Sequence, residues 1–230
     1  MNFKIVNNQD EGLEFAKNFL YKNVDEKTIL FLSGGKTPKN LYLSLSQEKK
    51  IKPGAVALAD ERYAREMHVD SNEKMIYDTG LLSYFKSKNI PFYRILGNGK
   101  SIEKLADSYD KTIRILFSNF PKSVGILGIG LDGHTAGLPV GRKELGEKEK
   151  TSYVTSFNNF PGEIKERITM TFLGLSQLKI LMVLVFGEDK REALELFLRD
   201  GSKEEIPARF FKEENILQKT IIVTDQKLKM

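Results

Sequence analysis

The chain has 230 residues, of which 40% are hydrophobic and 29% charged, as in a globular protein, and we expect residues 1–230 to form a single domain. The absence of cysteine excludes disulfides, thiolate catalysis and cysteine-ligated zinc. No apolar run approaches the roughly 18 residues that span a bilayer, and the N-terminus lacks the pattern of a signal peptide, so we expect a cytoplasmic protein without a membrane partner.

The net charge of +5 is compatible with an anionic ligand. The charges are mixed, as in residues 147–150, and no basic stretch alternates with aromatic residues as a single-strand binder would require. We therefore expect no nucleic-acid partner. A small phosphorylated metabolite fits the modest positive charge.

The predicted elements alternate between strand and helix along the chain. The first pair is a strand over 28–33 and a helix over 38–47, with Thr37 as the N-cap residue. The elements that follow are a strand over 55–59, a helix over 71–84 capped by Ser71, a strand over 92–96, an amphipathic helix over 102–116, strands over 124–127 and 180–186, a helix over 188–199 and a strand over 221–223.

This alternation predicts an α/β fold: a three-layer sandwich with a mostly parallel, Rossmann-like sheet. In such sheets, ligands bind beyond the carboxyl ends of the strands. Four polar or glycine-rich turns follow predicted strands, at residues 33–37, 60–62, 128–135 and 187–190. The sequence therefore predicts a binding site at that edge of the sheet.

The first of these turns has the properties of an anion cradle. Gly34 and Gly35 allow the backbone to approach a ligand, and the helix behind them presents unpaired N–H groups. Lys36 and Thr37 add two further donors. The turn is not a P-loop, because Leu30 stands where that motif has glycine. A plain strand-to-helix turn is the alternative interpretation.

Residues 128–133 match the pattern G-x-G-x-x-G, which indicates a nicotinamide-cofactor site in some folds. The charge of Asp132 would oppose a pyrophosphate, and Pro139 prevents the long helix that such a site needs. We therefore do not expect a dinucleotide at this turn.

His134 follows the same turn and is one of only two histidines. An imidazole takes up and returns protons near neutral pH, and Asp132 is close enough in sequence to orient it. His68 lies in a polar loop and is interpreted as structural or exposed. The histidine spacing gives no metal site, and the nucleophile-elbow pattern G-x-S-x-G is absent.

Three cations are candidates for holding an anion. Arg62 ends the Asp-Glu-Arg turn and can bind a phosphate through two parallel hydrogen bonds, while Asp60 of the same turn can accept from sugar hydroxyls. Lys190 lies early in a predicted helix, where the helix dipole disfavours a cation unless an anion is near. Arg167, at the start of a further strand, is a weaker candidate.

Taken in order, five segments resemble the 6-phosphogluconolactonase family. They are Leu-Ser-Gly-Gly-Lys-Thr-Pro, Asp-Glu-Arg with Asp-Ser-Asn downstream, Leu-Gly-Ile-Gly-Leu-Asp-Gly-His-Thr-Ala, Arg-Ile-Thr-Met-Thr and Gly-Glu-Asp-Lys, within residues 31–209. The resemblance implies metal-independent hydrolysis of 6-phospho-D-glucono-1,5-lactone to 6-phosphogluconate in the oxidative pentose phosphate pathway. It implies no cofactor, a phosphorylated sugar lactone as substrate, and a monomer or small homo-oligomer.

The related glucosamine-6-phosphate deaminases typically have Asp-Glu-Tyr where this chain has Asp-Glu-Arg. They continue His-Ile-Ala-Phe-Asn-Glu-Pro where this chain has His134 followed by Thr-Ala-Gly-Leu-Pro. Both differences favour the lactonase. Lactonases usually have Ser-Leu-Phe-Pro after Thr-Ala, so Gly137-Leu138-Pro139 departs from the family pattern. A deaminase-like enzyme and a non-catalytic sugar-phosphate sensor remain as alternatives.

The resemblance leads to a mechanistic expectation. His134 is the general base, oriented by Asp132 or by backbone groups. Backbone N–H groups at Gly34-Gly35 or at the turn that contains Gly133 stabilise the oxyanion. The cations named above hold the phosphate, and the division of roles between Asp60 and Asp132 stays open.

Overall fold

The computed structural model describes residues 2–97, 99–161 and 163–227. Its centre is a seven-stranded sheet in the order β1-β10-β9-β6-β2-β3-β5, in which every neighbouring pair is parallel. The strands are β1 (Asn2–Ile5), β2 (Thr28–Leu32), β3 (Ala55–Leu58), β5 (Phe92–Tyr93), β6 (Lys122–Gly128), β9 (Ile180–Val185) and β10 (Thr220–Thr224). The α/β prediction is confirmed.

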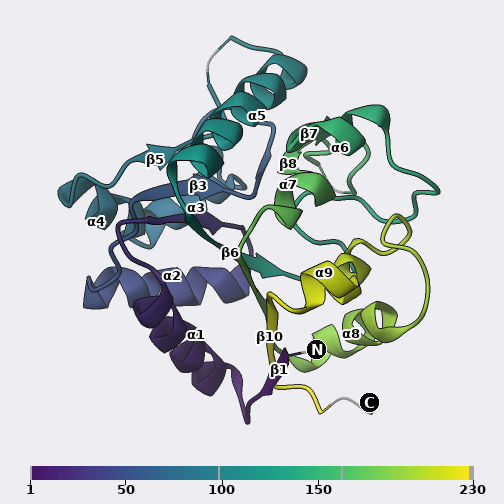
Figure 1. Ribbon diagram of the computed structural model, residues 1–230, viewed down its shortest axis with the longest axis horizontal. Coiled ribbons are helices and arrows are strands. Elements are labelled where there is room, and N and C mark those ends of the chain that lie inside the picture. Colours follow the sequence, from purple (N-terminus) through teal and green to yellow (C-terminus); the bar gives the residue numbers. More distant parts are fainter. Residues whose placement is uncertain (1, 98, 162, 228–230) are drawn as a thin grey trace.

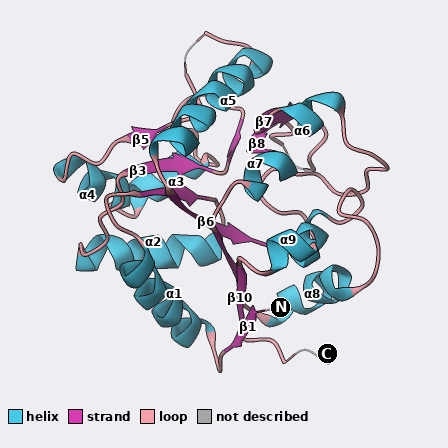
Figure 2. Ribbon diagram, in the orientation of Figure 1, coloured by secondary structure: helices cyan, strands magenta, loops and turns pink. Residues whose placement is uncertain are grey.

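Helices cover both faces of this sheet (Figure 1 and Figure 2). On one side lie α1 (Gln9–Asn23), α2 (Lys36–Glu48), α3 (Asn72–Asp78) and α4 (Leu81–Ser87). On the other lie α5 (Ile102–Asn119), α7 (Phe172–Ser176), α8 (Arg191–Leu198) and α9 (Glu214–Leu217). The remaining short segments are α6 (Glu147–Thr151) and the 3₁₀ turns η1 (Glu188–Lys190) and η2 (Pro207–Lys212).

A second, three-stranded antiparallel sheet was not expected from the sequence. Its order is β4 (Asp60–Arg62), β8 (Arg167–Met170) and β7 (Val154–Phe157). Only Ala59 separates β4 from β3, and the Ala59 carbonyl accepts a hydrogen bond from the Met170 N–H at 2.8 Å. The small sheet is therefore fixed at the carboxyl end of a central strand.

Two buried tyrosines hold the carboxyl ends of central strands. The Tyr42 hydroxyl donates to the Ser33 carbonyl (3.0 Å) and accepts from the Ser33 N–H (3.1 Å). Tyr109 does the same to the backbone of Leu58, with both distances 2.8 Å. Each hydroxyl bonds both the backbone N–H and the carbonyl of the residue it contacts, Ser33 or Leu58. The segments after β2 and β3 therefore start from fixed positions.

The helix boundaries differ from the expectation at three places. Gly35, at φ 115°, is the N-cap of α2, so Thr37 lies inside the helix instead of capping it. Ser71 caps α3 as expected, but Gly80 adopts φ 81° and divides the predicted helix into α3 and α4. The predicted helix over 188–199 begins with the 3₁₀ turn η1 before α8.

No helix among the described residues is both long enough and apolar enough to cross a bilayer.

Candidate active site

The four turns singled out in the sequence lie at neighbouring positions of the fold. Strands β9, β6, β2 and β3 are adjacent in the parallel sheet, so their carboxyl ends share one edge. Gly34 follows β2, Asp60 lies just beyond β3, His134 lies in the turn after β6, and Lys190 lies in the turn after β9. The topology brings the candidate residues to one edge of the sheet.

The imidazole of His134 is oriented by Asp132. Nδ1 of the ring lies 2.5 Å from Asp132 Oδ1, and the same oxygen accepts the His134 backbone N–H at 3.1 Å. Burial raises the pKa of Asp132, but the hydrogen bonds and charge of His134 outweigh burial and lower it to about 2. Asp132 is therefore a carboxylate at neutral pH, and Nε2 is the ring nitrogen that it leaves available.

The turn before His134 requires glycine at position 130. A Cβ there would lie 2.1 Å from two atoms of the His134 ring. The Gly130 N–H donates to the His134 carbonyl (2.8 Å), and the Gly133 N–H donates to the Gly130 carbonyl (3.0 Å). Gly130 therefore allows close packing against the imidazole, and the N–H groups of Gly130 and Gly133 are both engaged within the turn.

The small antiparallel sheet presents two arginines side by side. Arg62 of β4 and Arg167 of β8 are directly opposite in the register, so both side chains leave the same face of the sheet. Arg62 donates to the Asp70 carbonyl, and Arg167 donates to the Glu166 carbonyl at 3.0 Å. Burial and then the charge of Arg62 lower the pKa of Arg167, against the opposing charges of Asp60, Glu61 and Asp70.

Phe160 links the arginines to the imidazole. The Arg167 guanidinium lies 4.8 Å from the centre of the Phe160 ring, and the same ring makes an edge contact with the His134 ring at 5.8 Å. Phe160 is 6% exposed. Sequence reasoning missed this residue, because a single aromatic in a loop carries no pattern.

Asp60 is buried close to His134, Arg62 and Arg167. The Asn72 side-chain amide donates to the Asp60 carboxylate (3.1 Å) and to its carbonyl (2.9 Å). Burial raises the pKa of Asp60, against the opposing effects of Arg62, Asn72, His134 and Arg167. Asp132 contacts the imidazole and Asp60 does not, so the structure separates the two carboxylates.

Asn72 also explains the glycine at position 34. A Cβ at Gly34 would lie 1.9 Å from Asn72 Oδ1, so any side chain there would displace the amide. At the start of α2, Gly35 makes no side-chain cap, Lys36 is exposed and Thr37 is half-buried. The sequence pointed to Asn72 only through the resemblance of Asp-Ser-Asn to the family pattern.

Lys190 lies on the Asp132 side of His134. Its ammonium donates to the Ile129 carbonyl at 2.8 Å. Burial lowers the pKa of Lys190, while the charges of Asp189 and Asp132 oppose that effect. The charges of Arg62 and Arg167 act on Asp60 in turn, so the arginine pair lies near Asp60.

The segment 60–62, expected to be a turn, is strand β4, in which Glu61 is buried between Asp60 and Arg62 and is structural. Its carboxylate accepts the backbone N–H groups of Asn72 (2.7 Å) and Glu73 (2.8 Å) at the start of α3. Burial raises the pKa of Glu61, against these hydrogen bonds. Strand β4 therefore supplies two side chains to the candidate site and one anchor for α3.

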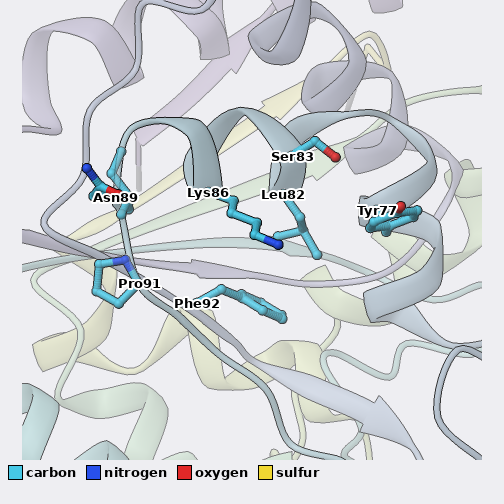
Figure 3. A pocket seen from close by; sticks show the side chains of 8 residues that line it. Tyr77, Leu82, Ser83, Lys86, Asn89, Pro91 and Phe92 are labelled. Atoms are coloured by element: carbon cyan, nitrogen blue, oxygen red, sulfur yellow. The ribbon is translucent and has the colours of Figure 1, made fainter.

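Two surface cavities lie outside this cluster. One, of about 470 Å³, is lined by α3, α4 and the start of β5, and Figure 3 shows Lys86 extending from α4 toward Phe92. It lies at the amino end of β5, and none of the candidate residues lines it. The second, of about 580 Å³, includes Tyr63 and Glu166, the sequence neighbours of Arg62 and Arg167.

Among the described residues, no group of three or more histidine and acidic side chains is arranged to hold a metal ion.

Comparison with known proteins gives consistent matches. Residues 14–222 match the profile of the family described as glucosamine-6-phosphate isomerases/6-phosphogluconolactonase. A 6-phosphogluconolactonase of Xylella fastidiosa (strain 9a5c) is 31% identical over 220 residues, which cover 88% of each chain. The crystal structure of a 6-phosphogluconolactonase from Shewanella baltica OS155 superimposes with a TM-score of 0.78 at 23% identity, covering 97% of both chains. A monomeric glucosamine-6-phosphate deaminase superimposes with a TM-score of 0.75 at 18% identity, covering 98% of both, so the fold alone does not separate the two activities.

Proposed function

Because the chain belongs to the glucosamine-6-phosphate isomerase/6-phosphogluconolactonase family, we propose that it is an enzyme that hydrolyses 6-phospho-D-glucono-1,5-lactone to 6-phosphogluconate in the oxidative pentose phosphate pathway. The observation that carries the proposal is the group formed by the His134–Asp132 pair, the buried Asp60 and the paired arginines. An ester carbonyl needs an activated water, and the phosphate needs cations.

In the proposed reaction, Nε2 of His134 removes a proton from water while the water oxygen attacks the lactone carbonyl. The Asp132 carboxylate fixes the ring through Nδ1 and stabilises the imidazolium that forms. The tetrahedral intermediate then collapses, the bond to the ring oxygen breaks, and the imidazolium returns its proton to that oxygen. A positioned base of this kind contributes about 10²- to 10⁴-fold.

The backbone N–H groups at the start of α2 are a better source of oxyanion donors than those of the turn that contains Gly130 and Gly133. The N–H groups of Gly130 and Gly133 already bond within their own turn. The N-cap of α2 is a glycine without a side-chain bond, and the first N–H groups of a helix have no partner within it. Gly35 is exposed and allows a ligand to approach these groups, with Lys36 and Thr37 at the edge, whereas the space beside Gly34 is filled by the Asn72 amide.

We assign the phosphate to Arg62, Arg167 and Lys190. The two arginines leave one face of the small sheet, and a phosphate dianion would relieve the repulsion between their charges. Asp60 faces the same region and can accept from sugar hydroxyls. Binding the distant phosphate would hold the lactone carbonyl against the base. The substrate is a small metabolite, so the proposal involves no nucleic-acid partner.

The direct test is hydrolysis of freshly prepared 6-phosphogluconolactone by the purified protein, after subtraction of spontaneous hydrolysis. Glucosamine 6-phosphate is assayed in parallel for release of ammonia. We expect enzyme-dependent lactone hydrolysis without ammonia release. Ammonia release would establish the deaminase instead, and binding of the sugar phosphate without turnover would establish a sensor.

A further inference from the structure

One largely buried arginine, Arg142, holds the far end of the loop that follows His134. The side chain of Arg142 is 13% exposed, and that of its partner Glu149 in α6 is 5% exposed. The guanidinium donates through Nε to the Pro139 carbonyl at 3.2 Å and through Nη1 to the Glu149 carboxylate at 2.5 Å. Arg142 therefore ties a backbone group of the loop to α6.

The surroundings of this ion pair are costly for a charge. The guanidinium lies over the rings of Phe157 (4.9 Å) and Phe172 (6.0 Å). Arg142 Nη2 and Glu149 Oε1 are buried and have no hydrogen-bond partner among the described residues. Attraction within a buried ion pair often fails to recover the free energy of desolvation. Stability is therefore a poor explanation for the pair, and the geometry that it imposes on the loop is a better one.

The loop held by Arg142 packs directly behind the candidate site. The Gly137 N–H donates to the Thr169 hydroxyl of β8 at 2.9 Å, and a Cβ at 137 would approach Arg167 Cβ to 3.3 Å. Leu138, next in the loop, is fully buried. The glycine at 137, where the family usually has serine, therefore lets the loop lie against β8 beside Arg167.

We propose that Arg142 is a positioning residue of the active site. By fixing the Pro139 carbonyl, it holds residues 134–142 against β8 and so sets the placement of the His134 imidazole relative to Arg167. Its effect on turnover rests on the proposed lactonase function. Its effect on the placement of the imidazole does not.

The kinetic test is Arg142→Lys, which keeps the charge but loses the Nε donor to Pro139. Arg114→Lys is a matched control, because Arg114 also pairs with a carboxylate (Asp110, 2.8 Å), donates to a carbonyl (Thr151, 2.8 Å) and lies over a ring (Tyr153, 4.1 Å). We expect kcat of Arg142→Lys to fall about 10- to 100-fold and that of the control to change little, since small displacements of reacting groups cost this much. Equal kcat values in the two variants would overturn the proposal.

A double variant separates positioning from stability. Arg142→Met with Glu149→Met removes both buried charges, and such replacements are often neutral or stabilising. We expect an unchanged or higher Tm together with a lowered kcat. A lower Tm with wild-type kcat would mean that the pair is only structural.

Nuclear magnetic resonance of histidine-labelled protein tests the proposal without substrate. The chain has only two histidines, so the ring signals of His134 and His68 can be assigned by substitution. We expect Arg142→Lys to shift the His134 signals and leave those of His68 in place, and Arg114→Lys to shift neither. Unmoved His134 signals would refute the positioning role even if the wild type is a lactonase. Shifted signals in a protein that does not hydrolyse the lactone would refute only the proposed function.

Discussion

The two carboxylates of the site differ in what they touch. Asp132 bonds the imidazole of His134, while Asp60 is buried against the Asn72 amide. The sequence left their roles open, because both follow strands and both lie near candidate groups. Contact with the ring, which sequence spacing does not report, assigns the orienting role to Asp132.

The orienting role predicts the effect of Asp132→Asn. An amide can donate to Nδ1 and so favour the tautomer with its proton on Nε2, which is unable to act as a base. We expect kcat to fall about 10²-fold or more, as for other misoriented bases, with KM within a few-fold of wild type. Steady-state kinetics check this, and a change confined to KM would contradict the orienting role.

The lowered pKa of Asp132 also predicts a stability change in acid. An unfolded aspartate has a pKa near 3.9, while that of Asp132 in the fold is about 2. Between these values the unfolded chain binds more protons, so this contribution to stability is present above about pH 4 and is lost toward pH 2.

Thermal unfolding of Asp132→Asn at several pH values checks whether the stability contributed by Asp132 is lost in acid. The variant is expected to have a lower Tm than wild type at pH 6, and the difference should shrink as the pH falls toward 2. The raised pKa of Asp60 favours the folded state as the pH falls, but it does so equally in wild type and in Asp132→Asn and therefore cancels in the difference. A difference in Tm that grows in acid would contradict the assignment.

The arginine pair predicts a loss of affinity. Removing a charged hydrogen-bond donor to phosphate typically costs 10- to 100-fold, so we expect Arg62→Ala and Arg167→Ala each to raise KM by about that factor. The change in kcat should be smaller. Arg199→Ala, which removes an exposed arginine at the end of α8, is the control. Unchanged KM values in the two site variants would exclude these arginines from phosphate binding.

At the scale of elements, the segment from the last residue of β6 to His134 depends on Gly130 more than on Gly128. A Cβ at Gly130 would overlap the His134 ring, whereas a Cβ at Gly128 would lie 3.6 Å from the Leu184 carbonyl oxygen, an ordinary contact. We expect Gly130→Ala to lower kcat strongly and Gly128→Ala to stay near wild type. Kinetics with circular dichroism of both variants check this, and similar kcat values in the two would show that ring placement tolerates the methyl group.

The sequence was informative about elements with a strong pattern. Apolar spacing located α5, and continuous apolar runs located β2 and β9, because central strands are buried on both faces. The strands β4 and β7 have three and four residues and no regular alternation, so no local pattern marked them, whereas the alternating residues of β8 follow the strand start expected at Arg167. The pairing of β4 with β8 joins residues about a hundred positions apart, so it is a tertiary property that no local pattern reports.

For the whole molecule, the order of strands determines the site. The alternation of elements predicted a parallel sheet and therefore one edge where polar turns meet. It did not predict that β4 and β8 would pair and place Arg62 opposite Arg167, nor that Phe160 would lie between Arg167 and His134. The sequence therefore supplied candidate residues one by one, and the contacts between them required the fold.

The proposed base, His134, lies where the segments after β2, β3, β6 and β9 meet, and His134→Gln is the decisive variant. We expect kcat for hydrolysis of 6-phosphogluconolactone, corrected for the spontaneous rate, to fall about 10²- to 10⁴-fold while Tm and KM stay close to wild type. A folded His134→Gln protein that turns over the lactone at the wild-type rate would contradict the role of His134 as the base.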